Sequence, residues 1–285
     1  MEIKKVAVIG GGLMGRQIAL HSAIYPYEVK LFDIMPQVRE AVKQWEEEYL
    51  AGRIAKGRMT EEQVAGIKSR FSVAETMEEA AADADIIIEA VLERIDVKHA
   101  VLKQISDIAR KDAIIATNSS YMVSSAFKED VVNPSRLLNV HYFNPALVMK
   151  LVEVVRGEHT SDEVFETAYN FAKSTGKTPV KVEKEIDGFL ANRILTAICT
   201  EARRLVEDGY CTYQDLDTAC ENGLGHPMGP FRLNDLTGID LAFDVMKRRY
   251  AETGVKPAGY DLYEKMVKEG RLGRKSGKGF YDYSK

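Results

Sequence analysis

A glycine-rich stretch near the amino terminus constrains this chain more than any other part of it. The apolar residues 6–9 run directly into Gly10-x-Gly12-x-x-Gly15, and a helical pattern follows. In this order Gly10 lets the chain turn sharply, Gly12 leaves room for a phosphate beside the backbone, and Gly15 lets the helix pack on the strand. The free N–H groups and the positive dipole at the helix start would then face that phosphate. The stretch therefore predicts a dinucleotide-binding turn.

An acidic residue follows at the spacing that such a turn requires. The next apolar run, residues 28–32, ends in Asp33, which lies 18 residues after Gly15. An acidic residue about 20 positions on holds the hydroxyls of the adenosine ribose in dinucleotide-binding folds. The alternative is an ordinary glycine turn with an unrelated strand-end Asp, but the order of strand, glycines, helix and acid favours a nucleotide site. Because an ionised Asp33 would repel a 2′-phosphate, and Ile34 and Met35 offer no arginine, we expect NAD as the cofactor rather than NADP.

Composition argues against several other kinds of protein. The 285 residues carry a formal net charge of −4, which disfavours a nucleic-acid-binding surface. No apolar run approaches the roughly 20 residues that a membrane span requires. The three cysteines form no C-x-x-C pair and are expected to be reduced thiols, with no metal site. The sequence also begins directly with its first strand, so we expect a cytoplasmic protein without a signal peptide.

Short apolar runs alternate with helical patterns through the first two thirds of the chain. This alternation predicts an α/β fold with a doubly wound, mainly parallel Rossmann-type sheet. The expected strands are residues 6–9, 28–32, 85–90, 113–116, 137–140, 150–155 and 179–182. Residues 36–70 interrupt the alternation, because a charged helix at 38–50 precedes a second helix that begins with the capping box Thr60-x-x-Gln63. We therefore expect a helical hairpin inserted into the sheet fold.

The tip of this hairpin, residues 51–58, is basic. It carries Arg53, Lys56 and Arg58. On composition alone this is a solvated helix end, whose cations suit the negative end of the helix dipole. A contact to an anionic substrate stays open, because such a substrate would need a local basic patch in a chain of net negative charge.

Strand-like runs stop near residues 183–187. Five helical patterns follow, at 189–206, 213–221, 233–236, 241–250 and 261–269. We therefore expect a dinucleotide-binding domain at residues 1–184 and an all-helical domain at residues 185–285, with the substrate between them at the carboxyl ends of the strands. A helical domain of about 100 residues is small for a separate core, so it is expected to pair with a second copy as a homodimer.

Several polar residues directly follow predicted strands, namely Asn118, Ser119, Ser120, His141 and Asn144. The carboxyl ends of parallel strands share one edge of a sheet, so these side chains are expected to converge on the cofactor. His141 is the candidate general acid/base because imidazole titrates near neutrality, although a histidine after an apolar strand is often a hydrogen-bonded core residue. Glu153 lies in the apolar run 151–155, where a buried carboxylate needs a partner. It either orients His141 or faces water at a sheet edge, and the sequence leaves both open.

Several longer motifs occur together in one order. They are residues 10–15, 89–93 with Lys98, 118–120, 141–145 with 148–153, Gly188-Phe189 with Asn192-Arg193, 226–230 and 273–281. With these motifs the chain closely resembles the L-3-hydroxyacyl-CoA dehydrogenases, especially the short single-function bacterial 3-hydroxybutyryl-CoA dehydrogenase type. The resemblance covers essentially the whole length.

The resemblance implies a reaction and a role for each matching residue. The reaction is reversible, NAD-dependent oxidation of (S)-3-hydroxyacyl-CoA, expected to be 3-hydroxybutyryl-CoA to acetoacetyl-CoA, in fatty acid or butyrate metabolism. His141 matches the general base and Glu153 its carboxylate partner. Ser120 and Asn192 match residues that hydrogen-bond the reacting oxygen and the acyl group, although Asn192 by itself reads as a helix cap. The implied cofactor-binding residues are Gly10, Gly12, Leu13, Met14, Gly15, Asp33, Ala90, Glu93, Lys98, Asn118 and Asn144.

The resemblance also gives the hairpin tip a function and leaves two alternatives for the protein. Lys56 matches a contact to the nucleotide of CoA, and Arg53 is assigned to the same group. One alternative is a dehydrogenase of a free hydroxy acid, such as gulonate or carnitine, on the same scaffold. The other is a non-catalytic structural protein that binds NAD. The presence of Ser120, His141, Glu153 and Asn192 argues against this last alternative.

Overall fold

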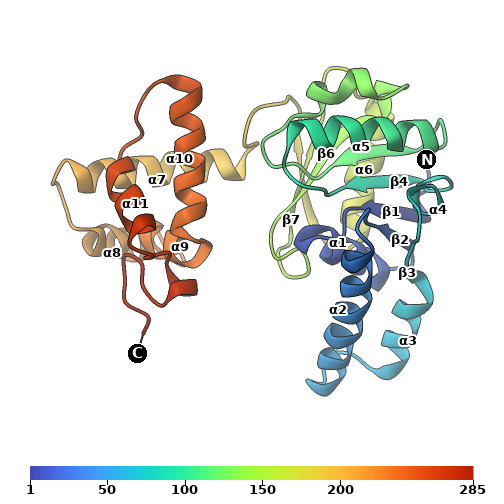
Figure 1. Cartoon of the computed structure of the whole chain (residues 1–285), viewed down its shortest axis with the longest axis horizontal. Coiled ribbons are helices and arrows are strands. Elements are labelled where there is room, and N and C mark those ends of the chain that lie inside the picture. The colour runs from blue at the N-terminus through green and yellow to red at the C-terminus, as the bar shows by residue number, and fades with distance from the viewer. Residues whose placement is uncertain (285) are drawn as a thin grey trace. The chain divides into compact units, whose positions relative to one another are not determined.

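The computed structural model describes residues 1–284, and their contacts divide the chain into a sheet unit, Met1–Leu190, and a helical unit that begins at Ala191 (Figure 1). The sheet has eight strands in the order β3-β2-β1-β4-β5-β6-β7-β8. The strands are β1 (Lys5–Ile9), β2 (Glu28–Phe32), β3 (Phe71–Val73), β4 (Ile86–Glu89), β5 (Ile114–Thr117), β6 (Leu137–Tyr142), β7 (Leu151–Val155) and β8 (Thr178–Val182). All neighbouring strands run parallel except β6 and β7, which are antiparallel. The predicted fold class, a mainly parallel Rossmann-type sheet followed by a helical domain, is confirmed.

Helices cover both faces of this sheet. They are α1 (Leu13–Ile24), α2 (Pro36–Ala55), α3 (Glu61–Arg70), α4 (Met77–Ala81), α5 (Ile95–Ile108) and α6 (Asp162–Ser174), with 3₁₀ turns at Ser124–Asp130 and Pro134–Arg136. Val6 and Val8 of β1 lie in one apolar core with α1, α2, α3 and α6, whereas Ala7 and Ile9 lie in the other with α4 and α5. Burial on both faces explains why the central strands are continuous apolar runs rather than alternating ones.

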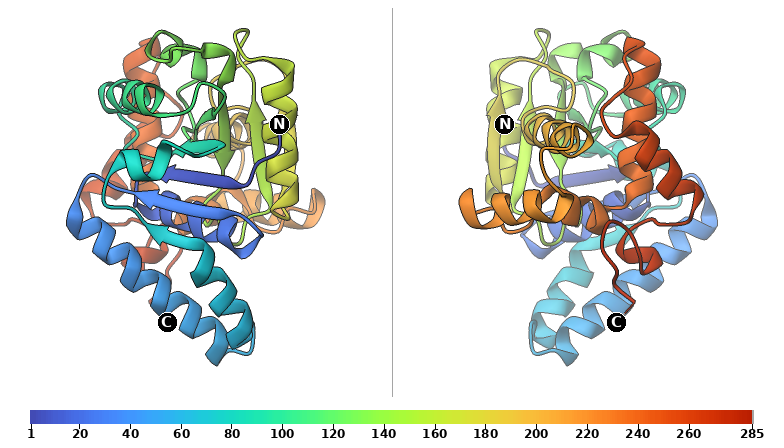
Figure 2. Two further views of the ribbon diagram at one scale, coloured as in Figure 1. Left: turned by 90° about the vertical axis from the view of Figure 1, so that its right-hand side faces the viewer. Right: turned by 90° about the vertical axis from the view of Figure 1, so that its left-hand side faces the viewer.

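The segment between β2 and β3 forms the expected helical hairpin, which projects from the sheet (Figure 2). Helix α2 is longer than predicted, because Pro36 fits the first turn of a helix and the helix continues to Ala55, into the expected tip. Helix α3 begins after Thr60, whose Oγ1 accepts the Gln63 N–H at 3.2 Å, while Gln63 Oε1 accepts the Thr60 N–H at 2.9 Å. The predicted capping box is confirmed.

Two short elements, β3 and α4, were not predicted. They have three and five residues, which is too short for an apolar period to show. Strand β3 extends the sheet beyond β2 through the pairing of Val29 with Phe71. The sheet is therefore one strand wider than the sequence indicates.

Between residues 191 and 284 the helical unit contains five α-helices, which overlap the five helical patterns of the sequence. They are α7 (Ala191–Glu207), α8 (Tyr213–Gly223), α9 (Pro230–Thr237), α10 (Ile239–Thr253) and α11 (Tyr260–Lys268), followed by a 3₁₀ turn at Arg274–Ser276. Buried Asp235 fastens the end of the chain, because its carboxylate accepts the N–H groups of Phe280 and Tyr281, both at 2.9 Å. A Cβ on Gly279 would lie 1.9 Å from Asp235 Oδ1, so packing explains why the motif at residues 273–281 has glycine at this position.

The sheet unit extends beyond residue 184, the predicted end of the first domain. Phe189 is fully buried beside Val155 and Val182, and the Leu190 N–H donates to Glu153 at 3.0 Å. Because these contacts hold the connecting segment on the sheet, the first unit ends at Leu190.

Within residues 1–284, no helix has the length and apolar character needed to cross a membrane. The same residues contain no group of His, Cys, Asp and Glu side chains arranged to hold a metal ion. The cysteines Cys199, Cys211 and Cys220 are free thiols.

Candidate active site

The glycine-rich turn joins β1 to α1. Gly10 has a φ of +112°, and a Cβ on it would lie 2.5 Å from the carbonyl oxygen of Ala90. A Cβ on Gly15 would lie 1.8 Å from the carbonyl oxygen of Gly10, whereas a Cβ on Gly12 would meet nothing within 4 Å. Packing therefore requires glycine at positions 10 and 15, while Gly12 borders open space into which a phosphate fits.

The start of α1 suits an anionic group. Gly12 is the N-cap, no described side chain caps the free N–H groups, and the first turn has no acidic residue. Leu13 is exposed at this turn and Met14 packs partly against the core. The unpaired N–H groups and the positive end of the helix dipole attract phosphate. These residues therefore fit the pyrophosphate of a dinucleotide.

Asp33 lies at the end of β2 with its carboxylate already oriented. Its Oδ2 accepts the Gly11 N–H at 2.7 Å, and its Oδ1 accepts the Met35 N–H at 2.9 Å. The neighbouring Arg39 donates to the carbonyl oxygen of Asp33 and to the carboxylate of Glu75, both at 2.9 Å. The guanidinium of Arg39 is thus held by a backbone carbonyl and by Glu75, and not by the carboxylate of Asp33.

His141 and Glu153 face each other across the antiparallel pair β6–β7. They are register partners, and Nδ1 of His141 lies 2.9 Å from Oε2 of Glu153. His141 is 3% exposed and Glu153 is 0% exposed. Glu153 therefore does not face water at a sheet edge. A carboxylate buried this deeply needs partners, and Glu153 accepts from the imidazole and, at 3.0 Å, from the Leu190 N–H.

Ser120 lies at the other ring nitrogen of His141. Its Oγ is 3.0 Å from Nε2. Because an ionised Glu153 can only accept, Nδ1 of the neutral ring carries the proton and Nε2 presents its lone pair. The ring can therefore take a proton at Nε2, and the carboxylate would stabilise the imidazolium that results.

Two aromatic rings enclose the imidazole. The ring centroid of Phe143 lies 4.5 Å from that of His141, and the ring centroid of Phe189 lies 5.5 Å from it. Phe189 is fully buried and has a φ of 45°, a left-handed conformation that bulky residues rarely adopt. The next N–H, that of Leu190, is the one that reaches Glu153. Backbone strain therefore occurs at the residue that packs on His141 and precedes this contact.

A second buried ion pair supports the loop that carries Ser120. Lys98 is 1% exposed, and its Nζ lies 2.8 Å from Glu89 and 3.2 Å from Glu93. Glu93 in turn accepts the Ser120 N–H at 3.1 Å and the Ser119 hydroxyl at 2.5 Å. Burial opposes ionisation of Glu93, but the charge of Lys98 and these hydrogen bonds outweigh it and hold the pKa of the carboxyl below its usual range.

Sequence reasoning missed Glu89. Its carboxylate is completely buried and accepts the Thr117 hydroxyl at 2.6 Å and the Val91 N–H at 2.7 Å, in addition to the ammonium of Lys98. A usable signal exists, because Glu89 closes an apolar strand and a carboxylate in such a run needs a partner. Lys98 is thus surrounded by carboxylates, and its contacts fix the chain near Ser120.

Other predicted cofactor residues lie at the same edge of the sheet. Asn118 follows β5, and its Oδ1 accepts the Tyr142 N–H at 2.9 Å, which joins the ends of β5 and β6. Asn144 is exposed in the loop after β6. Ala90 follows β4 and packs its carbonyl group against Gly10. These residues therefore border the carboxyl ends of the strands, where ligands of open α/β sheets bind.

The residues assigned to CoA lie on the helical hairpin. Lys56 is exposed at the C-cap of α2. Arg53 is half-buried, with its guanidinium 5.9 Å from the ring centroid of Tyr49. Within the described residues the buried Nε of Arg53 has no hydrogen-bond acceptor. Both cations are thus placed where an anionic group can approach the hairpin.

The four residues predicted to be catalytic fall into two groups. Ser120, His141 and Glu153 meet within the sheet unit. Asn192 is the second residue of α7 and belongs to the helical unit.

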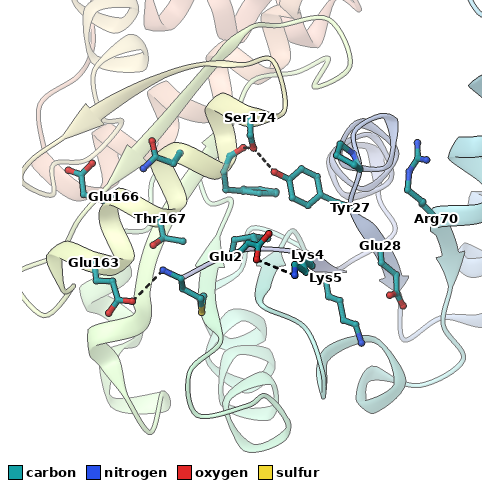
Figure 3. Close-up of a pocket in the computed structure, with 15 residues that line it drawn as sticks. Glu2, Lys4, Lys5, Tyr27, Glu28, Arg70, Glu163, Glu166, Thr167 and Ser174 are labelled. Atoms are coloured by element: carbon teal, nitrogen blue, oxygen red, sulfur yellow. Dashed lines mark hydrogen bonds and ion pairs between the residues drawn. The ribbon is translucent and has the colours of Figure 1, made fainter.

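A large pocket in the sheet unit is a different place from this site. It lies at the amino ends of β1 and β2 and along α6, and is lined by residues such as Lys5, Glu28 and Glu163 (Figure 3). Charged groups in it are partly paired already, as Lys4 is with Glu2 at 3.1 Å. Ligands of open α/β sheets bind at the opposite, carboxyl ends of the strands. The pocket therefore has no part in the reaction site.

Comparison with known proteins gives one family for both units. Residues 5–186 match the NAD-binding domain of 3-hydroxyacyl-CoA dehydrogenase, and residues 188–283 match its C-terminal domain. A probable 3-hydroxybutyryl-CoA dehydrogenase of Bacillus subtilis is 37% identical over 284 residues, which is 99% of this chain and 98% of that protein. The human mitochondrial hydroxyacyl-coenzyme A dehydrogenase is 36% identical over 99% of this chain and 91% of its own. The crystal structure of (S)-3-hydroxybutyryl-CoA dehydrogenase from Ralstonia eutropha has a TM-score of 0.90 at 34% identity, with all of both chains covered.

The first prediction concerns the choice of cofactor. We expect NADH to bind at least about tenfold more tightly than NADPH, because the oriented carboxylate of Asp33 repels a 2′-phosphate. Dissociation constants from nicotinamide fluorescence measure this. Asp33→Asn should reduce the ratio of the NADPH to the NADH dissociation constant. Asp107→Asn, on the exposed side of α5, should leave this ratio unchanged. Equal dissociation constants for the two cofactors in the unmodified protein would contradict the prediction.

Proposed function

The chain belongs to the 3-hydroxyacyl-CoA dehydrogenase family. We propose that its substrate is a short (S)-3-hydroxyacyl-CoA, namely 3-hydroxybutyryl-CoA. The enzyme oxidises it to acetoacetyl-CoA and catalyses the reverse reduction. We further propose that His141 is the general acid/base and that Glu153 assists it. The observation that carries this proposal is the buried His141–Glu153 pair with the Ser120 hydroxyl at the reactive nitrogen. This is the arrangement that proton transfer at a substrate oxygen requires.

The proposed proton transfer takes place at Nε2 of His141. In oxidation the Nε2 lone pair takes the proton of the substrate 3-hydroxyl, and Glu153 stabilises the imidazolium that forms. The Ser120 hydroxyl, 3.0 Å from Nε2, is assigned to hydrogen-bond the same substrate oxygen. In reduction the imidazolium returns the proton to the 3-oxo oxygen. NAD, held by the start of α1 and Asp33, would supply the acceptor for the hydride that leaves the substrate C3.

We assign the cofactor to the carboxyl ends of the strands. Gly12 and the start of α1 would hold its pyrophosphate, and Asp33 its adenosine ribose. Glu93, Asn118 and Asn144 border the same edge and are assigned to the rest of the cofactor. Asn192, on α7, is assigned to the acyl group of the substrate.

A direct assay tests the function. We expect NADH oxidation with acetoacetyl-CoA and a kcat/KM at least about 100-fold lower with free acetoacetate, because the free acid lacks the binding energy of CoA. A long substrate such as 3-oxodecanoyl-CoA should be turned over less efficiently than acetoacetyl-CoA. Equal efficiency with free acetoacetate would favour a hydroxy-acid dehydrogenase, and no turnover with any substrate would favour a non-catalytic NAD-binding protein.

The second prediction concerns Glu153. Glu153→Gln keeps the shape of the side chain but removes the charge that stabilises the imidazolium. The kcat of reduction should therefore fall by about 100-fold, and its decline with rising pH should begin at a lower pH than in the unmodified protein. The measurement is kcat for acetoacetyl-CoA reduction as a function of pH.

A double substitution and a surface control complete this test. Because Glu153 acts through the ring, His141→Ala combined with Glu153→Gln should cost little more than His141→Ala alone. The exposed Glu129 offers a matched control, and Glu129→Gln should leave the profile unchanged. If the fold-loss of kcat in the double variant equals the product of the losses in the two single variants, Glu153 does not act on His141.

The third prediction concerns the hairpin. Lys56→Ala should raise the KM for acetoacetyl-CoA by about tenfold and leave the KM for NADH nearly unchanged, because Lys56 is assigned to a CoA phosphate. Added salt should raise the same KM in the unmodified protein, since exposed charge contacts are screened. Lys103→Ala, an exposed lysine on the other face of the sheet unit, should have neither effect. If the KM for acetoacetyl-CoA responds to neither salt nor Lys56→Ala, the hairpin tip does not bind CoA and is an ordinary solvated helix end.

The fourth prediction concerns assembly. We propose a homodimer formed through the helical unit, because this unit leaves large apolar side chains exposed: Leu224, Leu236, Leu241 and Val255. Sedimentation velocity at micromolar concentration should give twice the mass of one chain. Leu241→Glu should shift the distribution towards one chain, and a single-chain mass for the unmodified protein would exclude the dimer.

A further inference from the structure

Lys177 is a buried lysine that the proposed mechanism does not use. It lies between α6 and β8 and is 7% exposed. Burial alone lowers the pKa of its ammonium to about 8 from an ordinary value of 10.5. Among the described residues, no carboxylate forms an ion pair with it. A buried ammonium without such a partner disfavours the folded state, so its presence calls for a functional reason.

The ammonium of Lys177 holds the loop between β6 and β7, residues 143–150, which we name the β6–β7 loop. It donates to the carbonyl oxygen of Ala146 and, at 2.8 Å, to that of Met149. Inside the loop, the N–H groups of Val148 and Met149 both donate to the carbonyl oxygen of Pro145 at 2.9 Å. Lys177 therefore fastens two carbonyl groups that these internal hydrogen bonds leave free.

The same loop borders the catalytic histidine. It begins with Phe143, whose ring centroid lies 4.5 Å from that of His141. The next residue is Asn144, which is assigned to the cofactor. The position of the loop therefore decides where these two side chains lie relative to the His141 ring.

The surroundings of Lys177 keep its ammonium directed at the loop. From α1, His21 places Nε2 2.9 Å from the carbonyl oxygen of Thr175, and burial together with the charge of Lys177 lowers the pKa of His21 to about 4. His21 is therefore neutral near pH 7 and adds no second positive charge. From β6, the ring centroid of Tyr142 lies 6.0 Å from Nζ of Lys177. These groups leave the two loop carbonyls as the acceptors of the ammonium.

We propose that Lys177 is a positioning residue: its ammonium clamps the β6–β7 loop and thereby holds Phe143 and Asn144 at the edge of the sheet where His141 lies. The inference rests on the proposed function of His141 and of the cofactor edge. It adds a residue that touches neither substrate nor cofactor and acts through the loop.

The first test, and the fifth prediction, is Lys177→Met, which removes the donors and nearly keeps the shape. The kcat for acetoacetyl-CoA reduction should fall about tenfold and the KM for NADH should rise several-fold, because Asn144 and Phe143 lose their fixed positions. The KM for acetoacetyl-CoA, whose nucleotide is assigned to the hairpin, should change less than about twofold. Lys181→Met is the matched control, because Lys181 lies on β8 and pairs with Glu166 at the surface. It should behave as the unmodified protein, and unchanged kinetics in Lys177→Met overturn the proposal.

Stability separates positioning from a merely structural role. Lys177→Met removes an unpaired buried charge, which favours folding, but leaves two carbonyl groups without a donor, which disfavours it; because the two effects oppose one another, Tm at pH 7 should stay within about 4 °C. Between pH 8 and 10.5 the unfolded chain binds more protons at Lys177 than the folded chain, so the unmodified protein gains stability relative to Lys177→Met as pH rises through this window. A large loss of Tm at pH 7 that parallels the loss of activity overturns the proposal.

Amide hydrogen exchange tests the clamp without any activity. Peptides covering the β6–β7 loop should exchange faster in Lys177→Met and at the normal rate in Lys181→Met. If the unmodified protein does not turn over acetoacetyl-CoA, the proposed function fails while this measurement still tests the clamp. Unchanged exchange, or faster exchange with unchanged kcat, overturns the proposal. If Lys177→Met does not fold, Lys177→Gln, which keeps a donor, should show intermediate exchange and intermediate kcat, and normal values for both overturn the proposal.

Discussion

The buried contact between His141 and Glu153 is the interaction on which the site depends. It exists because one pair of strands, β6 and β7, runs antiparallel in an otherwise parallel sheet. In an antiparallel pair, residues that face each other point to the same side of the sheet at short range. The strands themselves therefore set the distance between the imidazole and the carboxylate. Removing one partner of such a buried pair typically costs about 3–5 kcal/mol, so the sheet and the site stabilise one another.

The other buried charges are arranged around this contact. Glu89 and Lys98 fix the segment that carries Ser120, through Glu93. At the other ring nitrogen, Nδ1, Glu153 also accepts the N–H of Leu190, the residue after Phe189, which adopts a left-handed conformation. Each of these groups would be unfavourable alone, because a buried charge or a strained residue costs free energy. Together they hold the imidazole from both ring nitrogens.

The sequence carries the main lines of this structure but not its close contacts. Some features depend only on the spacing of residues close together in the sequence, and these could be predicted. They are the glycine turn, Asp33 and the capping box of the hairpin. Whether β6 and β7 run parallel or antiparallel cannot be deduced from two apolar runs. The contact between His141 and Glu153, which depends on the antiparallel pairing, could therefore only be proposed from the sequence. Strand β3 is too short to show a period. Residues 185–190 belong to the sheet unit through tertiary packing of Phe189, which no local pattern reveals.

The buried lysines illustrate the same limit from another direction. In the sequence, Lys98 stands in a helical pattern and Lys177 in a turn between a helix and a strand, where a lysine is ordinarily solvated. Only the folded chain shows that Lys98 lies between two carboxylates and that Lys177 donates to two carbonyl groups.

The difference between the partners of the two lysines has a physical reason. A carboxylate beside Lys177 would compete for the N–H groups that hold the β6–β7 loop. The backbone carbonyl groups of the loop do not compete, because they are themselves the acceptors through which the loop is held. Lysine suits this task because its flexible stem carries three donors to one point, while the planar fork of arginine matches a carboxylate better than two separate carbonyl groups. The two loops that flank His141 are thus fastened in different ways, one through a carboxylate that Lys98 keeps ionised and one by Lys177 directly.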